Sequence, residues 1–455
     1  MLAGRRGQDA FDITKARLPL LLGLLMGSAC LARASIYYDE EARCIRVVDF
    51  PEHAPCTLER LLYMDRLCGW GKVVHEPQQD SYTVTGDLWV GSNDGTDTYL
   101  QIAGPEHPHE TLIMRGNLLV YPYWIEGENP EEHYSKMPEA VNRLTVGVPG
   151  DASVAGALKF LDEADAGYSL SVGRFPLPDG SLGQGYGGQL HVYHGTITSA
   201  TPEPGGQFGA SSPIGGMNLC GNSVVLDHAT LSWIAGAATY GMGYNGKVAH
   251  TLFEHLGTAI INGKHDLVGC TFSNCEVAVR DYGSLDAVLT DCIFRDNDQN
   301  WTLTFSDRGL VCIDCTYDEP RKGNVYQAWR NKNTGQMQYP SFVSKRHTVV
   351  EVVDQAGQPV PGALVKVRCE QATSEIAENA TQRTNQLGRT PTRGEDGAIL
   401  LVEVVKQATE VPNQPKVTEL TYAMEASAEG YAPGRLEHFR PVESWQVVRI
   451  VLGKR

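Results

Sequence analysis

Residues 270–272 read Cys-Thr-Phe, and variants of this triplet recur through the middle of the chain. The aligned triplets are Ala229-Thr230-Leu231, His250-Thr251-Leu252, Cys270-Thr271-Phe272, Cys292-Ile293-Phe294 and Cys315-Thr316-Tyr317. They begin 21, 20, 22 and 23 residues apart. The first and third residues are mostly apolar and the middle one is usually threonine, an alternation typical of a strand with one buried side. Such a period suits one coil of a parallel β-solenoid, in which each coil stacks its strands on the previous one.

The first position of the triplet also accounts for several cysteines. Cys270, Cys292 and Cys315 share one column, and unpaired cysteine is among the most buried residue types. We therefore expect a stack of small side chains inside the solenoid. Cys312 and Cys315 have the spacing of a metal or redox pair, but neither a second pair nor a set of histidines accompanies them.

Composition agrees with a turn-rich, all-β protein of 455 residues. The 48 glycines have no period of three, which excludes a collagen-like chain, and the 42% hydrophobic content excludes disorder. The net charge of −16 disfavours nucleic acid as a partner, because an acidic chain repels a phosphate backbone.

The first 34 residues have the features of a secretory signal peptide. Basic residues precede an apolar run from Leu18 to Met26, and Ala32-Arg33-Ala34 supplies small residues for cleavage before Ser35. Lipidation of Cys30 is the alternative. Cleavage leaves 33 basic and 52 acidic residues, a net charge of −19. We expect a secreted, periplasmic or cell-surface protein without a transmembrane segment in the mature chain.

A short amphipathic helix is expected near the mature N-terminus. Thr57 is a candidate N-cap and Gly69 a candidate end. The leucines on or near one face are Leu58, Leu61, Leu62 and Leu67. Cys56 and Cys68 would lie about 18 Å apart along this helix, too far for a bond between them. Cys44 is expected to pair with one of them or with neither.

Residues 80 to 320 resemble the right-handed parallel β-helix superfamily that contains pectate lyases and polygalacturonases, the pectin lyase-like proteins. The stretch from Val224 to Ser232 looks like the pectate-lyase run of valine, tryptophan, isoleucine, aspartate and histidine, with Val225 in place of tryptophan. The chain has no Arg-x-Pro-x-x-Arg segment of the lyases and no Asn-Thr-Asp, Asp-Asp, Gly-His-Gly and Arg-Ile-Lys set of polygalacturonases. The resemblance implies a β-helix and a polysaccharide substrate, and it assigns no reaction.

The C-terminal hundred or so residues form a separate module. The pattern from Asp354 to Ala363, with Pro359 and Pro361, looks like a carboxypeptidase-regulatory-like, transthyretin-like β-sandwich, which implies a noncatalytic accessory domain. A stretch with basic residues and no acidic ones precedes this module. It either docks on the acidic solenoid as a linker or attracts an anionic polysaccharide. Its basic residues are Arg321, Lys322, Arg330, Lys332, Lys345 and Arg346. The expected segments are a signal peptide, an N-terminal cap, a β-helix, a linker and a sandwich, at 1–34, 35–80, 81–320, 321–345 and 346–455.

Outward side chains beside the inward pair should form rows about 4.8 Å apart from coil to coil. The row before the pair contains His228, Ala249, Gly269, Asp291 and Asp314. The row after it contains Ser232, Phe253, Ser273, Arg295 and Asp318. Asp291 and Asp314 thus become neighbours, with Arg295 close by. Two such carboxylates suit general acid and base catalysis or a shared calcium ion, although solvated aspartates on a strand edge give the same pattern.

A second group of candidates lies near the following turns. Lys264 or Arg280 could neutralise a uronate carboxylate or act as a base in β-elimination, although turns are often charged for solubility alone. The expected substrate contacts are made by His228, Asp318, Trp233 and Tyr240, of which the aromatic pair could stack on sugar rings.

Two functional classes follow from the sequence. The first is a secreted polysaccharide lyase or glycoside hydrolase that acts on an acidic polysaccharide in the solenoid groove. The second is a noncatalytic surface or adhesion protein in which the solenoid is a rigid spacer. A monomer is expected, and no cofactor is assigned beyond the calcium option. The first class requires Asp291, Asp314 and Arg295 to converge beside Lys264 or Arg280.

Overall fold

The computed structural model describes residues 35–91, 96–120, 141–161, 168–176, 182–184, 188–201, 217–219, 223–240, 246–261, 266–281, 288–304, 309–332, 334–371 and 379–455. Within these ranges the chain is almost entirely β-structure, in long sheets that contain many parallel strand pairs. The expected signal peptide, with Cys30, lies outside the described residues.

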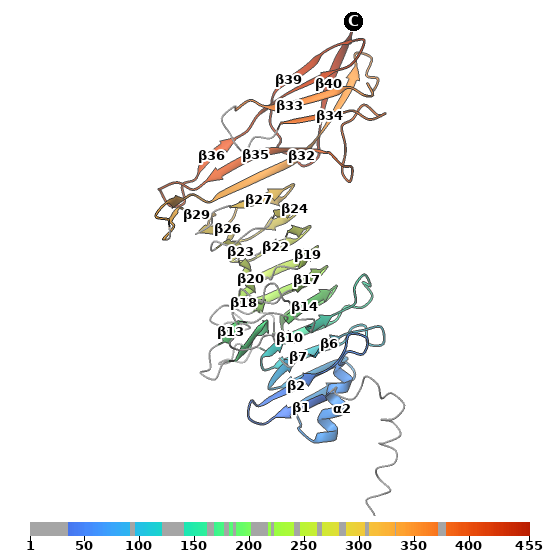
Figure 1. Ribbon diagram of the computed structural model, residues 1–455, viewed down its shortest axis with the longest axis vertical. Coiled ribbons are helices and arrows are strands. Elements are labelled where there is room, and N and C mark those ends of the chain that lie inside the picture. The colour runs from blue at the N-terminus through green and yellow to red at the C-terminus, as the bar shows by residue number, and fades with distance from the viewer. Residues whose placement is uncertain are drawn as a thin grey trace, which may run out of the picture.

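Three columns of strands run along the molecule, and strands pair in parallel with their counterparts in neighbouring repeats (Figure 1). The first column contains β6 (Thr98–Ile102), β9 (Asn142–Val146), β14 (Gly188–Tyr193), β17 (Ser223–Asp227), β19 (Lys247–Ala249), β21 (Leu267–Val268), β24 (Val288–Thr290) and β27 (Leu310–Ile313). The second contains β4 (Ser81–Thr85), β7 (Thr111–Arg115), β10 (Ala157–Phe160), β15 (Thr196–Ser199), the first parts of β18 (Thr230–Tyr240) and β20 (Leu252–Ile261), β22 (Thr271–Ser273), β25 (Ile293–Arg295) and β28 (Thr316–Tyr317). The third contains β2 (Cys44–Val48), β5 (Asp87–Val90), β8 (Leu118–Val120), β11 (Leu170–Val172), β16 (Met217–Leu219), the last parts of β18 and β20, β23 (Val277–Asp281), β26 (Gln299–Thr304) and β29 (Val325–Gln327).

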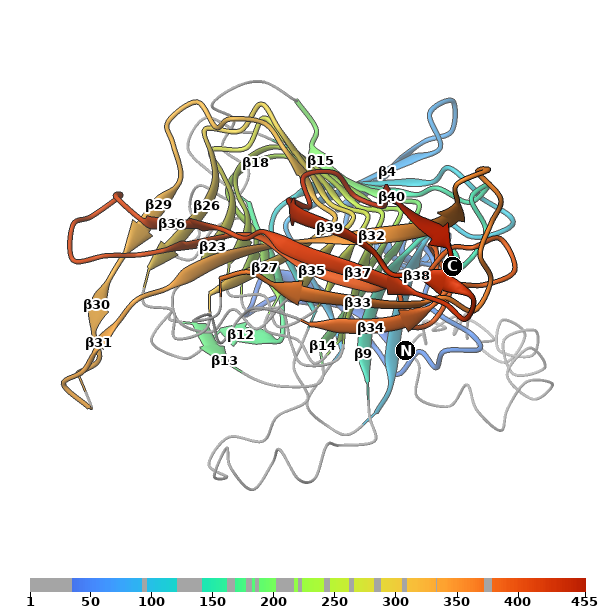
Figure 2. The ribbon, with the colours of Figure 1, turned by 90° about the horizontal axis from the view of Figure 1, so that it is seen from above.

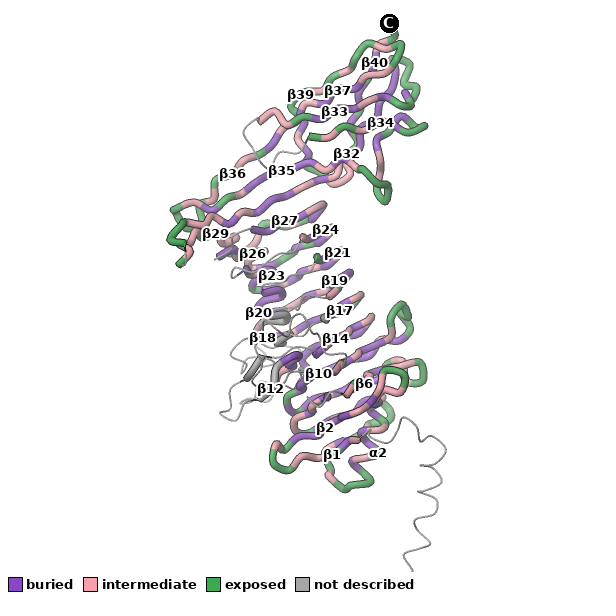
Figure 3. Tube along the Cα trace, viewed as in Figure 1, coloured by how far each residue is buried: buried purple, intermediate pink, exposed green. Residues whose placement is uncertain are grey.

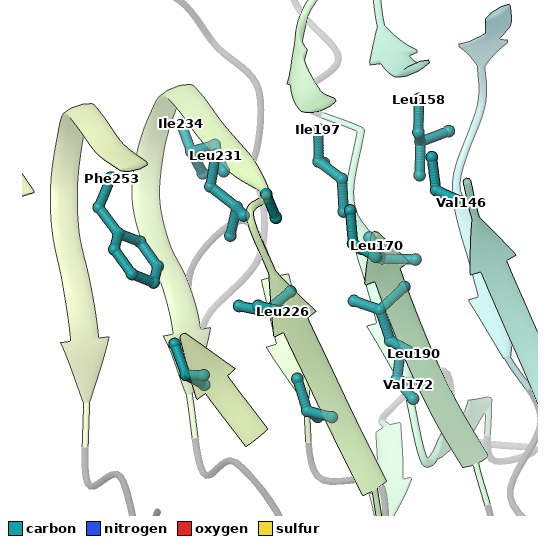
Figure 4. Packing of buried hydrophobic residues seen from close by; sticks show 14 of the residues in the cluster. Val146, Leu158, Leu170, Val172, Leu190, Ile197, Leu226, Leu231, Ile234 and Phe253 are labelled. Carbon is teal, nitrogen blue, oxygen red and sulfur yellow. The ribbon is translucent and has the colours of Figure 1, made fainter. Parts of the chain in front are cut away.

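The alternating residues of the three columns fill one shared interior. Figure 4 shows Leu190 and Leu226 from the first column, Ile197 and Leu231 from the second and Leu170 from the third, all fully buried. Viewed from above in Figure 2, successive strands of the repeats lie over one another. This all-β arrangement of long parallel ladders is compatible with a β-helix.

The register of the second triplet differs from the sequence alignment. Leu231 pairs with Phe253, which pairs with Phe272, so the equivalent triplet is Thr251-Leu252-Phe253 and the prediction was wrong by one residue. Leu252 faces outward and is half-buried, whereas Phe253 is fully buried and stacks on Phe272 at 5.1 Å between ring centroids. Both residues are apolar, so the alternation alone did not distinguish them.

The predicted cysteine stack is confirmed. Cys270, Cys292 and Cys315 are buried at equivalent positions of successive repeats. The thiol of Cys292 donates to the carbonyl of Thr290 at 3.4 Å and to that of Leu267, in the previous repeat, at 3.6 Å.

The N-terminal end of the columns is closed by the helix α2 (Leu58–Cys68). Thr57 accepts a hydrogen bond from the Arg60 amide as N-cap, and Gly69 ends the helix with a φ of 71°, as expected. The buried leucines are Leu58, Leu61 and Leu62. Leu67 is 65% exposed, so its assignment to the buried face was wrong. Two further strands, β1 (Ser35–Asp39) and β3 (Val73–Glu76), pair antiparallel with β2 and β4.

Cys44, Cys56 and Cys68 are free thiols, and the first two are buried. Cys44 therefore pairs with neither of the other two, which is one of the two outcomes that the sequence left open. Burial raises the pKa of Cys44 to about 11, with smaller effects from neighbouring charges, which keeps this thiol protonated at neutral pH.

The C-terminal region has two sheets around its own apolar cluster. One contains β32 (Ser341–Asp354), β35 (Ile399–Gln407), β36 (Lys416–Glu419), β38 (Tyr431–Ala432) and β40 (Gln446–Lys454). The other contains β33 (Leu364–Cys369), β34 (Ala380–Arg383), β37 (Tyr422–Ser427) and β39 (Gly434–Phe439). Side chains such as Val350, Val365 and Tyr422 fill the cluster, which fits a β-sandwich. Figure 3 shows buried stretches, in purple, in the strands of both sheets.

The long strand β32 connects the two regions. Its residues from Phe342 to Lys345 pair in parallel with β27, and its residues from Thr348 to Asp354 pair with β40. The strand thus crosses the expected linker boundary at residue 345 without a break. Two short antiparallel pairs complete the described strands: β12 (Arg174–Pro176) with β13 (Leu182–Gln184), and β30 (Trp329–Arg330) with β31 (Met337–Gln338).

Candidate functional site

A corner with left-handed backbone separates the first column from the second. Its residues have φ values between 50° and 64° in consecutive repeats: His194, His228, His250, Gly269, Asp291 and Asp314. Each amide donates to a carbonyl of the next repeat, as from His228 to Ala249 at 3.0 Å. This region of φ is strained for most side chains and least so for glycine, asparagine, aspartate and histidine. The corner therefore favours aspartate and histidine, whose side chains can also bind ligands or transfer protons.

The predicted row of His228, Gly269, Asp291 and Asp314 lies along this corner, with one correction. His250, rather than Ala249, is the equivalent of His228, because Ala249 pairs with Asp227 one position earlier. The one-residue error in the triplet alignment is the cause.

The two candidate carboxylates are neighbours, but each is bound by the C-terminal region. Asp314 is buried and accepts from the His347 amide at 2.9 Å, with His347 Nδ1 at 2.5 Å. Burial alone would raise the pKa of Asp314, but the hydrogen bonds from His347 outweigh it and the pKa lies below its ordinary value. Asp291 lies 2.6 Å from a guanidinium nitrogen of Arg393. Each carboxylate therefore has its own partner in the C-terminal region.

Arg295 and Asp318 lie along the opposite edge of the second column. The predicted row contained Phe253, but the equivalent residue is Glu254, because Phe253 points inward and is fully buried. Arg295 is four residues beyond Asp291, a distance of about 13 Å along a strand. Arg280 belongs to the third column and pairs with Ile261 and Thr302 in register. Arg295 and Asp318 are thus neighbours in adjacent repeats, but neither Arg295 nor Arg280 lies in the corner row of Asp291 and Asp314.

The remaining candidates are separated too. Lys264 and the side chain of Tyr240 lie outside the described residues. Trp233 occupies a second left-handed corner, at the end of the first part of β18, and stacks on His255 with 4.0 Å between ring centroids. His228 lies two residues before the start of the same strand, on the first corner.

Apart from His228, an expected substrate contact, the sequence analysis did not predict the polar surface on the outward side of the first column. Arg143 lies 4.8 Å above the Tyr99 ring, donates to Gln189 at 2.7 Å and pairs with Glu52 at 2.8 Å. Each of these contacts joins different strands or loops, because the side chains project from equivalent outward positions of neighbouring repeats. They hold the guanidinium in a fixed place above the sheet.

A histidine and a tyrosine continue this surface on β14. The Tyr193 hydroxyl lies 3.4 Å from His191 Nδ1. Burial, assisted by the Arg143 charge, lowers the pKa of His191 to about 4, so its imidazole is neutral at pH 7. Burial raises the pKa of Tyr193. The pair therefore presents neutral hydrogen-bonding groups beside a cation.

The surface ends in a ladder of three neighbouring imidazoles at the corner, of which His194 and His228 are stacked and His228 and His250 are tilted. His228 lies between His194 and His250, with ring centroids 4.9 Å and 4.7 Å away. Asp227 lies 2.9 Å from His228 Nδ1 and 2.6 Å from Lys247 Nζ. Burial opposes ionisation of Asp227, but the bonds from Lys247 and His228 hold its pKa below the ordinary value.

We refer to these groups together as the first-column surface: Arg143, Gln189, His191, Tyr193, Asp227, Lys247, His194, His228 and His250. The alternation in Gln189-Leu190-His191-Val192-Tyr193 contains part of this signal, since it places three polar residues on one side of a strand. Their alignment with Arg143 and Asp227 required the strand register, which the irregular spacing of the earlier repeats concealed.

Hydroxyl-rich ligands suit this surface, because charged and neutral donors and acceptors alternate along it over several repeats. Among the described residues, no three histidine, cysteine or acidic side chains are grouped to hold a metal ion. Within the same residues, no helix has the length and apolar character needed to cross a bilayer. No protein-family model, curated protein or solved structure matches this chain.

Proposed function

We propose that this chain is an exported right-handed β-helix protein that binds a polysaccharide along the first-column surface and carries a C-terminal β-sandwich accessory domain. The observation that carries the proposal is the fixed guanidinium of Arg143, held by Gln189 and Glu52 beside neutral His191 and Tyr193. Oriented donors of this kind, on a rigid sheet, recognise sugar hydroxyls without reorganisation. Binding without catalysis is the better supported class, because the C-terminal region engages the carboxylates expected to catalyse.

The test is binding of the purified mature chain to neutral, uronic-acid and sulfated polysaccharides. Arg143→Ala and Gln189→Ala are expected to weaken binding about tenfold or more, since each removes an oriented donor or its support. Arg295→Ala is the matched control, because it deletes an exposed arginine from a different face. Unchanged affinity of the Arg143 variant, with its thermal stability preserved, contradicts the proposed surface.

A polysaccharide lyase is the second candidate, and one observation favours it. Elimination from a uronate requires a cation for the carboxylate and neutral groups that accept and donate a proton, and Arg143, His191 and Tyr193 supply these types of group together. Incubation with the same panel, with and without a calcium chelator, separates the classes. New ultraviolet absorbance indicates elimination, new reducing ends without it indicate hydrolysis, and binding without either supports the noncatalytic class.

A further inference from the structure

The net charge at the imidazole ladder depends on how many of its rings carry a proton. The ionised groups that face it are Asp151 beside His194, and Asp227 with Lys247 beside His228. With neutral imidazoles these groups sum to −1, and three protonated imidazoles bring the sum to +2. Tyr193 is the other titratable neighbour, and its raised pKa keeps it uncharged over this range.

The ladder is open at the surface and ends where the backbone makes room for it. His228 and His250 are exposed. A Cβ atom on Gly269 would lie 2.5 Å from His250 Nδ1, so the absence of a side chain at position 269 lets the His250 ring extend over the next repeat. The following corner residue, Asp291, is already paired with Arg393. The three histidines therefore form a continuous group within the corner, which Gly269 separates from the paired Asp291.

Stacked imidazoles repel one another once they are protonated, because the ring centroids are less than 5 Å apart. An anionic group lying across the rings removes this repulsion, so proton uptake and anion binding favour each other. A row of rings at the spacing of the repeats suits a chain that carries anionic groups at intervals along its length.

We propose that His194, His228 and His250 form an acid-activated subsite for the sulfate or carboxylate groups of an anionic polysaccharide. This inference rests on the proposed function, since it names the charge class of the ligand that the first-column surface binds. Acidification from neutral pH turns the corner from repulsive to attractive for such a chain, and salt weakens the attraction because the ladder is exposed.

The experiment compares a sulfated polysaccharide with its desulfated form at roughly pH 7.5 and roughly pH 5.5, on either side of the ordinary imidazole range. The sulfate groups keep their charge over this interval. We expect affinity for the sulfated chain to rise about tenfold or more at the lower pH, with net proton uptake in calorimetry across buffers of different ionisation enthalpy. Affinity for the desulfated chain should change little.

Asparagine is the appropriate replacement, because it tolerates left-handed backbone and does not titrate in this range; Asn274 has a φ of 54° at the other corner. The triple variant His194→Asn, His228→Asn and His250→Asn should lose the acid enhancement, so that its affinity for the sulfated chain is nearly the same at the two pH values. His438→Asn is the matched control, since His438 has a φ of 57° and lies 2.9 Å from a Glu370 carboxylate oxygen, in the C-terminal region.

The outcomes separate this inference from the proposed function. The proposed role of the ladder is contradicted if the acid enhancement persists in the triple variant or is lacking in the unmodified chain. Either result leaves the proposed polysaccharide binding untouched. Failure to bind either form at either pH contradicts both. Thermal melts of each variant at both pH values show whether a loss of enhancement comes from unfolding.

Discussion

Single residues at the corners determine where this chain turns and where its charges lie. The second corner repeats the pattern of the first, with positive φ values at Trp233, His255, Asn274 and Asp296. Three of these four residue types are among those that tolerate left-handed backbone best. The same physical selection therefore places polar side chains in rows, whether or not a ligand uses them.

Glu110 offers a test of a buried carboxyl near the N-terminal corner. It accepts from the Ala103 amide at 3.1 Å, and burial raises its pKa from 4.5 to about 7. A raised pKa in the folded state means that this group favours folding most below pH 4.5, and that the contribution is lost as the pH rises to about 7. Glu110→Gln should therefore stabilise the protein at pH 8 by about 1–2 kcal/mol after allowance for solvent screening.

Chemical denaturation at pH 4.5 and at pH 8 checks this expectation. The variant and the unmodified chain should have nearly the same stability at the lower pH, where Glu110 is protonated when folded. A variant that is less stable than the unmodified chain at pH 8 would contradict the expectation, because it would show that the ionised carboxylate supports the Ala103 amide better than a neutral acceptor does.

Asp314 and Asp291 form a natural pair for comparison, because they occupy the same row with opposite exposure. The side chain of Asp314 is 2% exposed and that of Asp291 is 33% exposed. Asp314→Ala should cost about 2–4 kcal/mol, since it leaves the His347 amide without its acceptor, while Asp291→Ala should cost less than about 1 kcal/mol. Equal shifts in the thermal midpoints of the two variants would contradict the assigned burial.

The depressed pKa of Asp314 gives this comparison a pH dependence. A carboxyl with a lowered folded-state pKa stabilises the protein above its ordinary value of 3.8 and loses that contribution as the pH falls toward the folded value. The difference between the Asp314 variant and the unmodified chain should therefore shrink in strong acid, as measured by denaturation at several pH values.

At the scale of the element, equivalent interior positions of successive repeats show which side chains can replace one another. Thr251 occupies the column of the buried cysteines and donates to the carbonyls of Ala249 and Leu226 at 3.0 and 3.2 Å. Cys270 makes the equivalent contacts to Val268 and Val248. Volume and hydrogen bonding, more than thiol chemistry, therefore determine which residue fits this position.

Cys270→Thr should accordingly change the free energy of unfolding by less than about 1.5 kcal/mol, whereas Cys270→Leu should cost about 2 kcal/mol or more by overpacking. Thermal melts of the two variants under reducing conditions measure the difference. If threonine proves as disruptive as leucine, the shared role of Thr251 and Cys270 is wrong.

At the scale of the whole molecule, β32 and Arg346 couple the two regions. Arg346 is almost completely buried, pairs with Glu403 at 2.9 Å and donates to the Cys315 carbonyl. Trp445 stacks on His347 with 4.4 Å between centroids. Because one continuous strand belongs to both regions, we expect calorimetry to show a single cooperative unfolding transition.

Arg346→Met tests this coupling. The change removes the cation that pairs with Glu403 and leaves its carboxylate the Ser344 hydroxyl as a side-chain donor. It should cost about 3–5 kcal/mol, with the single calorimetric transition broadening or separating into two. Arg393→Ala is the matched control, because its pair with Asp291 is largely exposed and should contribute less than about 1 kcal/mol. Two transitions in the unmodified chain would contradict the coupling itself.

The sequence by itself determined the β-structure, the repeat length, the buried cysteine column and the capped helix near the N-terminus. Those features follow from local alternation and short-range capping, which depend on neighbouring residues. It also placed Asp291 and Asp314 side by side, since their spacing equals one repeat. Only the tertiary structure decided that His347 and Arg393 bind these carboxylates, because both partners come from the C-terminal region. The same holds for the first-column surface: Arg143, His191 and Asp227 are separated by unequal intervals, and only the pairing of β9, β14 and β17 brings them onto one face.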